Sequence, residues 1–164
     1  MTAQQYEAWT RPLRKRPFLT KMLLRINKAL TALVYVAYPL LLLVLLLQND
    51  ARFLSVLLTP AISFVLVSVS RSRVNAPRPY EQLDIQPLIH KDTRGHSFPS
   101  RHVFSSAVIS CAFLYTFSRV GMVLLLVTAL LAVIRVLGGV HFPRDVIAGF
   151  GIGLLAGWIG FVLL

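Results

Sequence analysis

Three short clusters of basic residues carry the side chains in this chain that are best suited to chemistry. Each cluster lies at the end of an apolar stretch, and they read Arg71-x6-Arg78-Pro79, Pro99-Ser100-Arg101-His102 and Arg135-x5-His141-x3-Asp145. Guanidinium groups suit the oxygens of a phosphate, and a histidine supported by a carboxylate suits attack on phosphorus. These residue types therefore indicate phosphoryl transfer at one end of an apolar bundle.

The second cluster fits the start of a helix. Proline favours the first helical turn, where free backbone N–H groups and the positive end of the helix dipole attract anions. Ser100 adds a hydroxyl donor at this point, and His102 lies within the same turn. For this cluster alone, the plainer alternative is a serine cap beside a solvated histidine.

His141 and Asp145 are four residues apart, around Pro143 at the expected start of another helix, so their side chains can face each other. The carboxylate would hold one imidazole nitrogen as N–H and leave the other nitrogen free to attack. The alternative is an interfacial pair that caps the last helix without taking part in chemistry.

The arginines have alternative explanations as well. Arg135 ends an apolar helix, where an ionisable side chain is a functional candidate by default, although it could also snorkel to the interface. Arg71 and Arg78 flank a short stretch after another apolar run and could simply anchor the loop. Anchoring or surface positions are all that we expect for Arg73, Lys91, Arg94, Arg144, His90 and His96.

The composition places these clusters in a membrane protein. Of the 164 residues, 56% are apolar and only 14% are charged, and the mean hydropathy is +0.70. This is far too apolar for an ordinary soluble domain. The formal net charge is +11, but the basic residues lie at the ends of apolar runs. Lipid phosphates and membrane lipids are therefore the expected partners, and nucleic acid is not.

Apolar runs at about 29–49, 53–70, 103–118, 120–134 and 146–164 are predicted to be transmembrane helices. Residues 4–28 contain seven Lys or Arg among apolar side chains, and are predicted to form an interfacial helix; the alternative is a positive flank for the first span. The expected fold is an all-α integral membrane helical bundle of about five transmembrane helices. A basic amphipathic segment, 1–28, precedes a membrane-embedded domain, 29–164.

Two further features concern how these helices are connected and packed. The polar segment 71–98 is long for a connection, and long loops are often functional. Gly149, Gly153 and Gly157 form a stripe at every fourth position of the last run. The stripe predicts close helix packing, either inside the bundle or between protomers of a homo-oligomer.

The three clusters resemble the signature of the type-2 phosphatidic acid phosphatase family, which are integral-membrane lipid phosphatases related to vanadium haloperoxidases. The family pattern reads Lys-x6-Arg-Pro, Pro-Ser-Gly-His and Ser-Arg-x5-His-x3-Asp. The spacing within each part is intact, and the resemblance covers roughly residues 53–164. Three positions depart from the pattern, because Arg71 replaces lysine, Arg101 replaces glycine and Ile134 replaces serine.

The resemblance implies a role for each matching residue. His141 would be the nucleophile that forms a phosphohistidine, Asp145 would orient it, and His102 would protonate the leaving oxygen. The phosphate would be bound by Arg71, Arg78, Ser100, Arg135 and the backbone N–H of Arg101. No cofactor and no metal are implied, because the arginines supply the positive charge.

The distribution of Lys and Arg predicts on which side of the membrane the site lies. Two spans separate the N-terminus from residue 71, so both lie on one side of the membrane, and that side carries most of the Lys and Arg outside the site. The positive-inside rule then places the site in the cytoplasm. Many bacterial members of the family are instead placed with the site on the outer face.

The leading hypothesis is a membrane lipid phosphatase that acts on a lipid phosphomonoester or pyrophosphate. Candidate substrates are phosphatidylglycerophosphate, phosphatidate and undecaprenyl pyrophosphate. A lipid phosphotransferase would use the same phosphohistidine with an acceptor other than water. A non-catalytic protein that binds anionic lipid would explain the basic tail and the glycine stripe, but not the spacings within the His-containing clusters.

Overall fold

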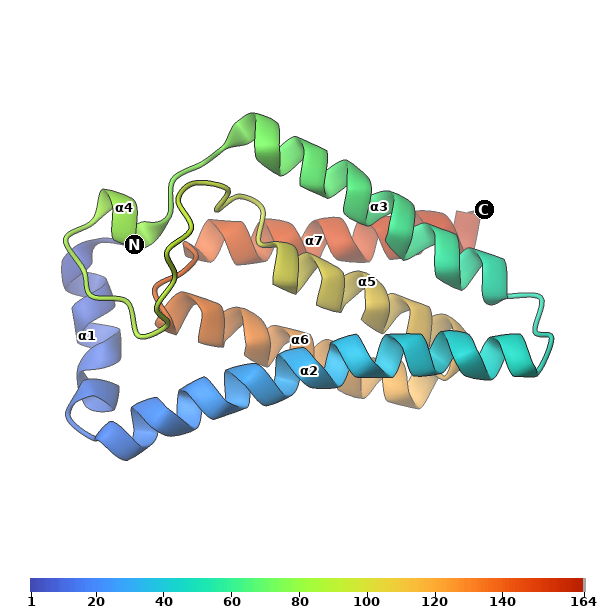
Figure 1. Ribbon diagram of the computed structural model, residues 1–164, viewed down its shortest axis with the longest axis horizontal. Coiled ribbons are helices and arrows are strands. Elements are labelled where there is room, and N and C mark those ends of the chain that lie inside the picture. Colours follow the sequence, from blue (N-terminus) through green and yellow to red (C-terminus); the bar gives the residue numbers. More distant parts are fainter. Residues whose placement is uncertain (164) are drawn as a thin grey trace.

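The computed structural model describes residues 1–163, and this part of the chain forms an elongated bundle of helices without strands (Figure 1). The elements in chain order are α1 (Ala3–Arg14), α2 (Pro17–Leu47), α3 (Phe53–Val74), α4 (Pro79–Gln82), α5 (Arg101–Thr116), α6 (Ser118–Leu137), α7 (Pro143–Trp158) and the π-helical η1 (Ile159–Leu163).

Within residues 1–163, four helical segments are long and apolar enough to cross a membrane: α2, α3 continued to Gln82, α6, and α7 with η1. The prediction of an all-α membrane bundle is confirmed, and the expected number of about five spans is close. The third predicted span, α5, is helical where expected. It has only 16 residues, and it lies inside the bundle rather than beside the other spans.

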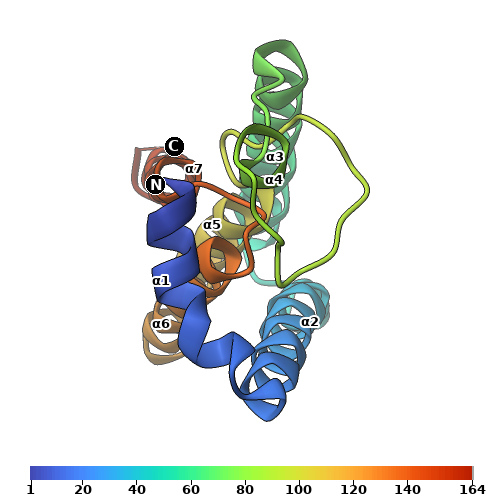
Figure 2. The ribbon, with the colours of Figure 1, turned by 90° about the vertical axis from the view of Figure 1, so that its left-hand side faces the viewer.

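α5 occupies the middle of the bundle, with α2, α3, α6 and α7 around it (Figure 2). Its residues 103–110 are all buried, as expected for a helix enclosed on every side. Two of its buried hydroxyls are paired: Ser106 Oγ lies 2.6 Å from Thr128 Oγ1, and Ser110 Oγ donates to the Ser106 carbonyl at 2.7 Å. The other helices therefore hold α5 from several sides.

The glycine stripe lets α7 approach α5 closely. A Cβ placed on Gly149 would lie 2.6 Å from the Ser100 carbonyl oxygen, and one on Gly153 would lie 2.6 Å from the Ala107 Cβ. Gly157 is equally crowded by Cys111. The stripe is therefore used inside the chain, the first of the two predicted alternatives. A homo-oligomer built through the stripe is incompatible with this packing, because α5 already occupies that face of α7.

The basic N-terminal segment divides into two parts. α1 runs across one end of the bundle (Figure 1), while residues 17–28 form the first turns of α2, with no break at residue 28. Pro17 at the first position of α2 explains the early start, since proline is preorganised for a helical N-terminus. The buried Tyr6 anchors α1, because its hydroxyl donates to the Leu137 carbonyl at 3.2 Å and accepts from the Leu88 N–H at 3.3 Å.

Candidate active site

The three sequence clusters meet at one end of the bundle, the end crossed by α1. The last turns of α3 and α6 and the first turns of α5 and α7 all lie there, and the segment that joins α3 to α5 folds over them (Figure 1). The expectation that the clusters share one face is therefore met by the geometry.

His141 and Asp145 form the buried centre of this end. The His141 side chain is 2% exposed and Asp145 is fully buried, and 3.6 Å separates His141 Nδ1 from Asp145 Oδ2. The same Oδ2 accepts hydrogen bonds from the Ser97 hydroxyl at 2.5 Å and from the Phe142 N–H at 2.9 Å. Ser97 Oγ is also 3.4 Å from His141 Nδ1. Because Nδ1 faces this polar group, Nε2 is the nitrogen left for chemistry.

Local sequence explains why the carboxylate lies here. Pro143 starts α7, and Asp145 is the third helical residue, so its side chain can turn back to the N–H of the residue that precedes the helix. The Ser100 N–H donates to the Asp145 carbonyl oxygen at 2.8 Å. This bond ties the start of α5 to the start of α7, and therefore joins the second cluster to the third.

Burial lowers the pKa of His141 to about 4. The neighbouring Asp145 carboxylate opposes that shift, while the positive charges of Arg78 and Arg135 add to it. The imidazole is therefore neutral at neutral pH, and a neutral imidazole has a lone pair available for nucleophilic attack.

Three of the four arginines of the clusters are buried, namely Arg71, Arg78 and Arg135. The Arg71 guanidinium donates to the carbonyl oxygens of Pro99 and His96. Arg78 donates through Nε to the Gly95 carbonyl at 3.0 Å and through a terminal nitrogen to the Val140 carbonyl at 3.2 Å. These bonds hold the covering segment and the residue before His141 in place.

Two donors of the sequence clusters have no partner within residues 1–163. They are Arg135 Nε and the Ser100 hydroxyl, both on buried side chains. Buried polar groups are normally hydrogen-bonded, so an unpartnered donor calls for an explanation, and an anionic ligand is one.

The two remaining predicted site residues lie in the first turn of α5. His102 is partly buried, and its ring is 6.3 Å from that of Tyr35. Arg101 is exposed and its guanidinium stacks over the Phe64 ring at 5.6 Å.

A cavity of about 310 Å³ opens beside the arginines, and its lining includes residues that sequence reasoning treated only as anchors or surface positions. It is lined by Ser68, Arg71, Ser72, Arg78, Lys91, Thr93, Arg94, His96 and Arg101. Burial lowers the pKa of Lys91 to about 8, and nearby arginines add to the shift. The length and basic character of segment 71–98 could have indicated from the sequence that Lys91 and Arg94 belong to the site. Nothing in the sequence indicated Ser97, because it belongs to no recognisable motif.

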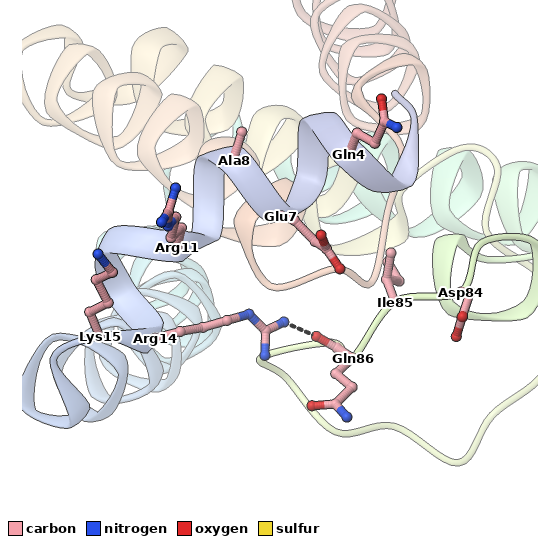
Figure 3. A pocket seen from close by; sticks show the side chains of 9 residues that line it. All are labelled: Gln4, Glu7, Ala8, Arg11, Arg14, Lys15, Asp84, Ile85 and Gln86. Atoms are coloured by element: carbon pink, nitrogen blue, oxygen red, sulfur yellow. Dashed lines mark hydrogen bonds between the residues drawn. The ribbon is translucent and has the colours of Figure 1, made fainter.

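A larger cavity lies elsewhere. It measures about 910 Å³ and is formed between α1 and residues 84–86, where the Arg14 guanidinium donates to the Gln86 carbonyl (Figure 3). No residue of the three clusters lines it. Its walls bring together neither a nucleophile with a base nor a group of buried arginines, so we assign the chemistry to the end of the bundle where the three clusters meet.

Among the described residues, no group of three or more His, Cys, Asp or Glu is placed to hold a metal ion.

Comparison with known proteins identifies the family. Residues 52–164 match the PAP2 superfamily. The chain belongs to this superfamily. The matched range contains all three clusters and agrees with the range over which the family pattern was recognised in the sequence. α1 and α2 lie outside it.

Relatives of this PAP2 protein include an undecaprenyl-diphosphatase from Sulfolobus acidocaldarius, which is 29% identical over 130 residues. Those residues are 78% of this chain and 62% of the relative, so the chain spans less than two-thirds of the relative's length. Among solved structures, LpxE from Aquifex aeolicus superimposes with a TM-score of 0.75 at 25% identity, covering 97% of this chain and 93% of LpxE.

A PAP2-type phosphatidylglycerolphosphate phosphatase from Bacillus subtilis has a TM-score of 0.66 at 23% identity, covering 96% of this chain and 83% of that protein. This likeness concerns the fold alone. Together with the four membrane-spanning segments, the family shows that the chain is a multi-pass membrane protein.

Proposed function

We propose that this PAP2 protein is a metal-independent membrane lipid phosphatase that hydrolyses a lipid phosphomonoester or pyrophosphate through a phosphohistidine. The observation that carries the proposal is the buried contact of His141 with Asp145 and Ser97, beside three buried arginines. Its position at the end of membrane-spanning helices suits a substrate whose phosphate lies at the bilayer surface.

In the first step, His141 Nε2 attacks phosphorus, forming an N–P bond as the P–O bond to the leaving group breaks. Asp145 holds the Nδ1 side and stabilises the charge that develops on the imidazole. His102 protonates the leaving oxygen. In the second step, His102 takes a proton from water, the water oxygen attacks the phosphohistidine, and inorganic phosphate leaves with His141 restored.

The phosphate would be held by donors that converge on the same end of the bundle. Arg71 and Arg78 keep N–H groups beyond those bonded to the loop carbonyls, since each guanidinium has five. Arg135 Nε and the Ser100 hydroxyl are unpartnered donors, and the backbone N–H of Arg101 lies in the first turn of α5. Preorganised donors of this kind stabilise negative charge as it develops on phosphate oxygens.

The relatives act, by their names, on undecaprenyl diphosphate and on phosphatidylglycerolphosphate. We take these two lipids and phosphatidate as the candidate substrates.

The distribution of Lys and Arg favours a cytoplasmic site, because the end opposite the site offers only Arg52 and Arg119. Protease accessibility of an N-terminal tag in sealed inverted vesicles tests this orientation.

The experiment is phosphate release in detergent from these three lipids, comparing wild type, His141→Ala and the matched control His90→Ala. His90 is exposed and lies outside the cavity of the site. We expect release by wild type and by the control, and none by His141→Ala. Vanadate should inhibit without added metal, and a chelator should have no effect. Release that survives in His141→Ala would refute the proposal.

A further inference from the structure

The cavity at the site is more positive than one phosphate group requires. Arg71 and Arg78 on its wall belong to the sequence clusters, but Lys91 and Arg94 do not. Arg101 stands where the family pattern has glycine. No carboxylate is present among the nine lining residues. Like charges gathered in a partly buried site repel one another, and an anion with additional charge would relieve the repulsion.

The surroundings of Arg101, Lys91 and the α3 side of the cavity bear on its affinity for anions. The Arg101 guanidinium lies over the Phe64 ring at 5.6 Å, which restricts its motion. Lys91 is partly buried, and burial together with the surrounding arginines lowers its pKa, so a bound anion would stabilise the charged form of its ammonium. On the α3 wall, the Ser68 hydroxyl is buried and has no partner within residues 1–163, so it too is a donor available to a ligand.

Arg78 links the cationic side of this cavity to the catalytic centre. Arg78 lines the cavity and also donates to the carbonyl of Val140, the residue before His141. The cavity volume of about 310 Å³ is at the lower end of the range for ligand sites. This is enough room for a small anionic group adjacent to the phosphate under attack.

We propose that Lys91, Arg94 and Arg101 form a second anion subsite, which binds a phosphoryl group of the substrate other than the one under attack. The inference rests on the proposed phosphatase function and narrows it to lipids with two phosphoryl groups, such as a diphosphate. The substrate's remote phosphoryl group then supplies binding energy through contacts that a monophosphate cannot make.

A matched pair of substrates tests this subsite: farnesyl diphosphate and farnesyl monophosphate have the same chain and differ by one phosphoryl group. Wild type is expected to favour the diphosphate by roughly tenfold or more in kcat/KM, because each charge-assisted contact is strong. Arg101→Gly and Lys91→Gln should each reduce that preference about tenfold, mainly through KM for the diphosphate. In Lys91→Gln, monophosphate hydrolysis should change little.

The control is Arg73→Gln, which removes one exposed charge of the same face without touching the cavity; its substrate preference should equal that of wild type. If Arg101→Gly fails to fold, Arg101→Gln removes the same charge while keeping a side chain at the helix start. A wild type without preference, or a preference unchanged in Arg101→Gly and Lys91→Gln, would overturn the subsite while leaving the phosphatase intact.

A binding measurement separates this proposal from the catalytic one. In the His141→Ala protein, methylenediphosphonate should bind more tightly than inorganic phosphate by calorimetry, and Arg101→Gly should abolish the difference. This result would support the subsite even if no lipid were hydrolysed. Equal binding of the two anions, or binding of two independent inorganic phosphates, would overturn it, because the cavity would then hold free phosphate rather than a linked pair.

Discussion

Ser97 should be essential for the reactivity of His141, and Ser97→Ala is the sharpest perturbation of the site. The serine hydroxyl lies between the two partners, 2.5 Å from Asp145 Oδ2 and 3.4 Å from His141 Nδ1. Without it, the carboxylate oxygen retains one donor, the Phe142 N–H at 2.9 Å. The carboxylate is then held by one donor fewer, and the imidazole loses one of the two groups that face its Nδ1 side.

The size of the effect follows from the bond that is lost. A hydrogen bond to a charged group contributes about 1.5–3 kcal/mol, and about 1.4 kcal/mol corresponds to a tenfold change in rate. We therefore expect kcat to fall about 10- to 100-fold. KM should stay close to the wild-type value, because Ser97 does not line the cavity beside the arginines.

The assay is single-turnover formation of the phosphohistidine, followed by quenching and detection of the labelled protein. This step reports the attack of His141 directly, separately from water attack and product release. The control is Ser105→Ala, which removes another buried hydroxyl, one with no partner in the described part of the chain. It should change neither the rate nor KM.

A phosphohistidine rate for Ser97→Ala within twofold of wild type would refute the reasoning. So would a loss that appears only in KM, because the serine would then act on binding rather than on the nucleophile. A loss shared equally by Ser105→Ala would show that any cavity near α5 impairs the enzyme. In that case the position of Ser97 between His141 and Asp145 would have no special meaning.

Three further predictions test the electrostatics and the packing. The pKa of His141 is about 4 in the folded protein and 6.5 ordinarily, so between pH 4 and pH 6.5 the unfolded chain binds a proton that the folded chain does not. The thermal midpoint should therefore fall as the pH drops from 6.5 toward 4, and it should fall less in His141→Gln. Gly153→Ala should lower the free energy of unfolding by about 1–3 kcal/mol through overpacking against α5, while Gly151→Ala, which meets no atom within 4 Å, should leave it unchanged or raise it. Tyr6→Phe removes two hydrogen bonds that hold α1, so trypsin should cut after α1 faster, with about 1–2 kcal/mol lost from the free energy of unfolding; unchanged cutting would contradict this.

Hydropathy was sufficient to predict the long helices. The runs at 53–70 and 120–134 became α3 and α6 with their ends extended by a few residues. The start of α2 was placed twelve residues too late, at 29 instead of Pro17, because charged side chains in 17–28 interrupt the apolar run without interrupting the helix. Long basic side chains can keep their charges in water while the backbone stays helical.

The central place of α5 was beyond the reach of hydropathy. A 16-residue apolar helix reads as a short span, and only the packing of four neighbours shows that it is enclosed. In retrospect its serines are a signal, since Ser106 and Ser110 can be buried only where partners such as Thr128 satisfy them.

The loop residues of the site could not be predicted for a different reason. The path of segment 83–100 depends on contacts between residues far apart in the chain. Glu81 accepts hydrogen bonds from the N–H groups of Arg78 and Gly95, and this brings Ser97 to Asp145. No periodicity encodes such a contact, so Ser97 and Lys91 emerged only from the structure.

The departure at Arg71 has a structural explanation in the same loop. Its two terminal nitrogens donate to two different carbonyls, those of Pro99 and His96. A guanidinium can bridge two acceptors with its planar fork and still keep donors for a phosphate, whereas the ammonium of lysine is a single point of charge. Arg71 therefore both fixes the segment that carries Ser97 and supplies charge to the site. Arg71→Lys, which restores the family residue, should on this argument loosen the segment while preserving the charge.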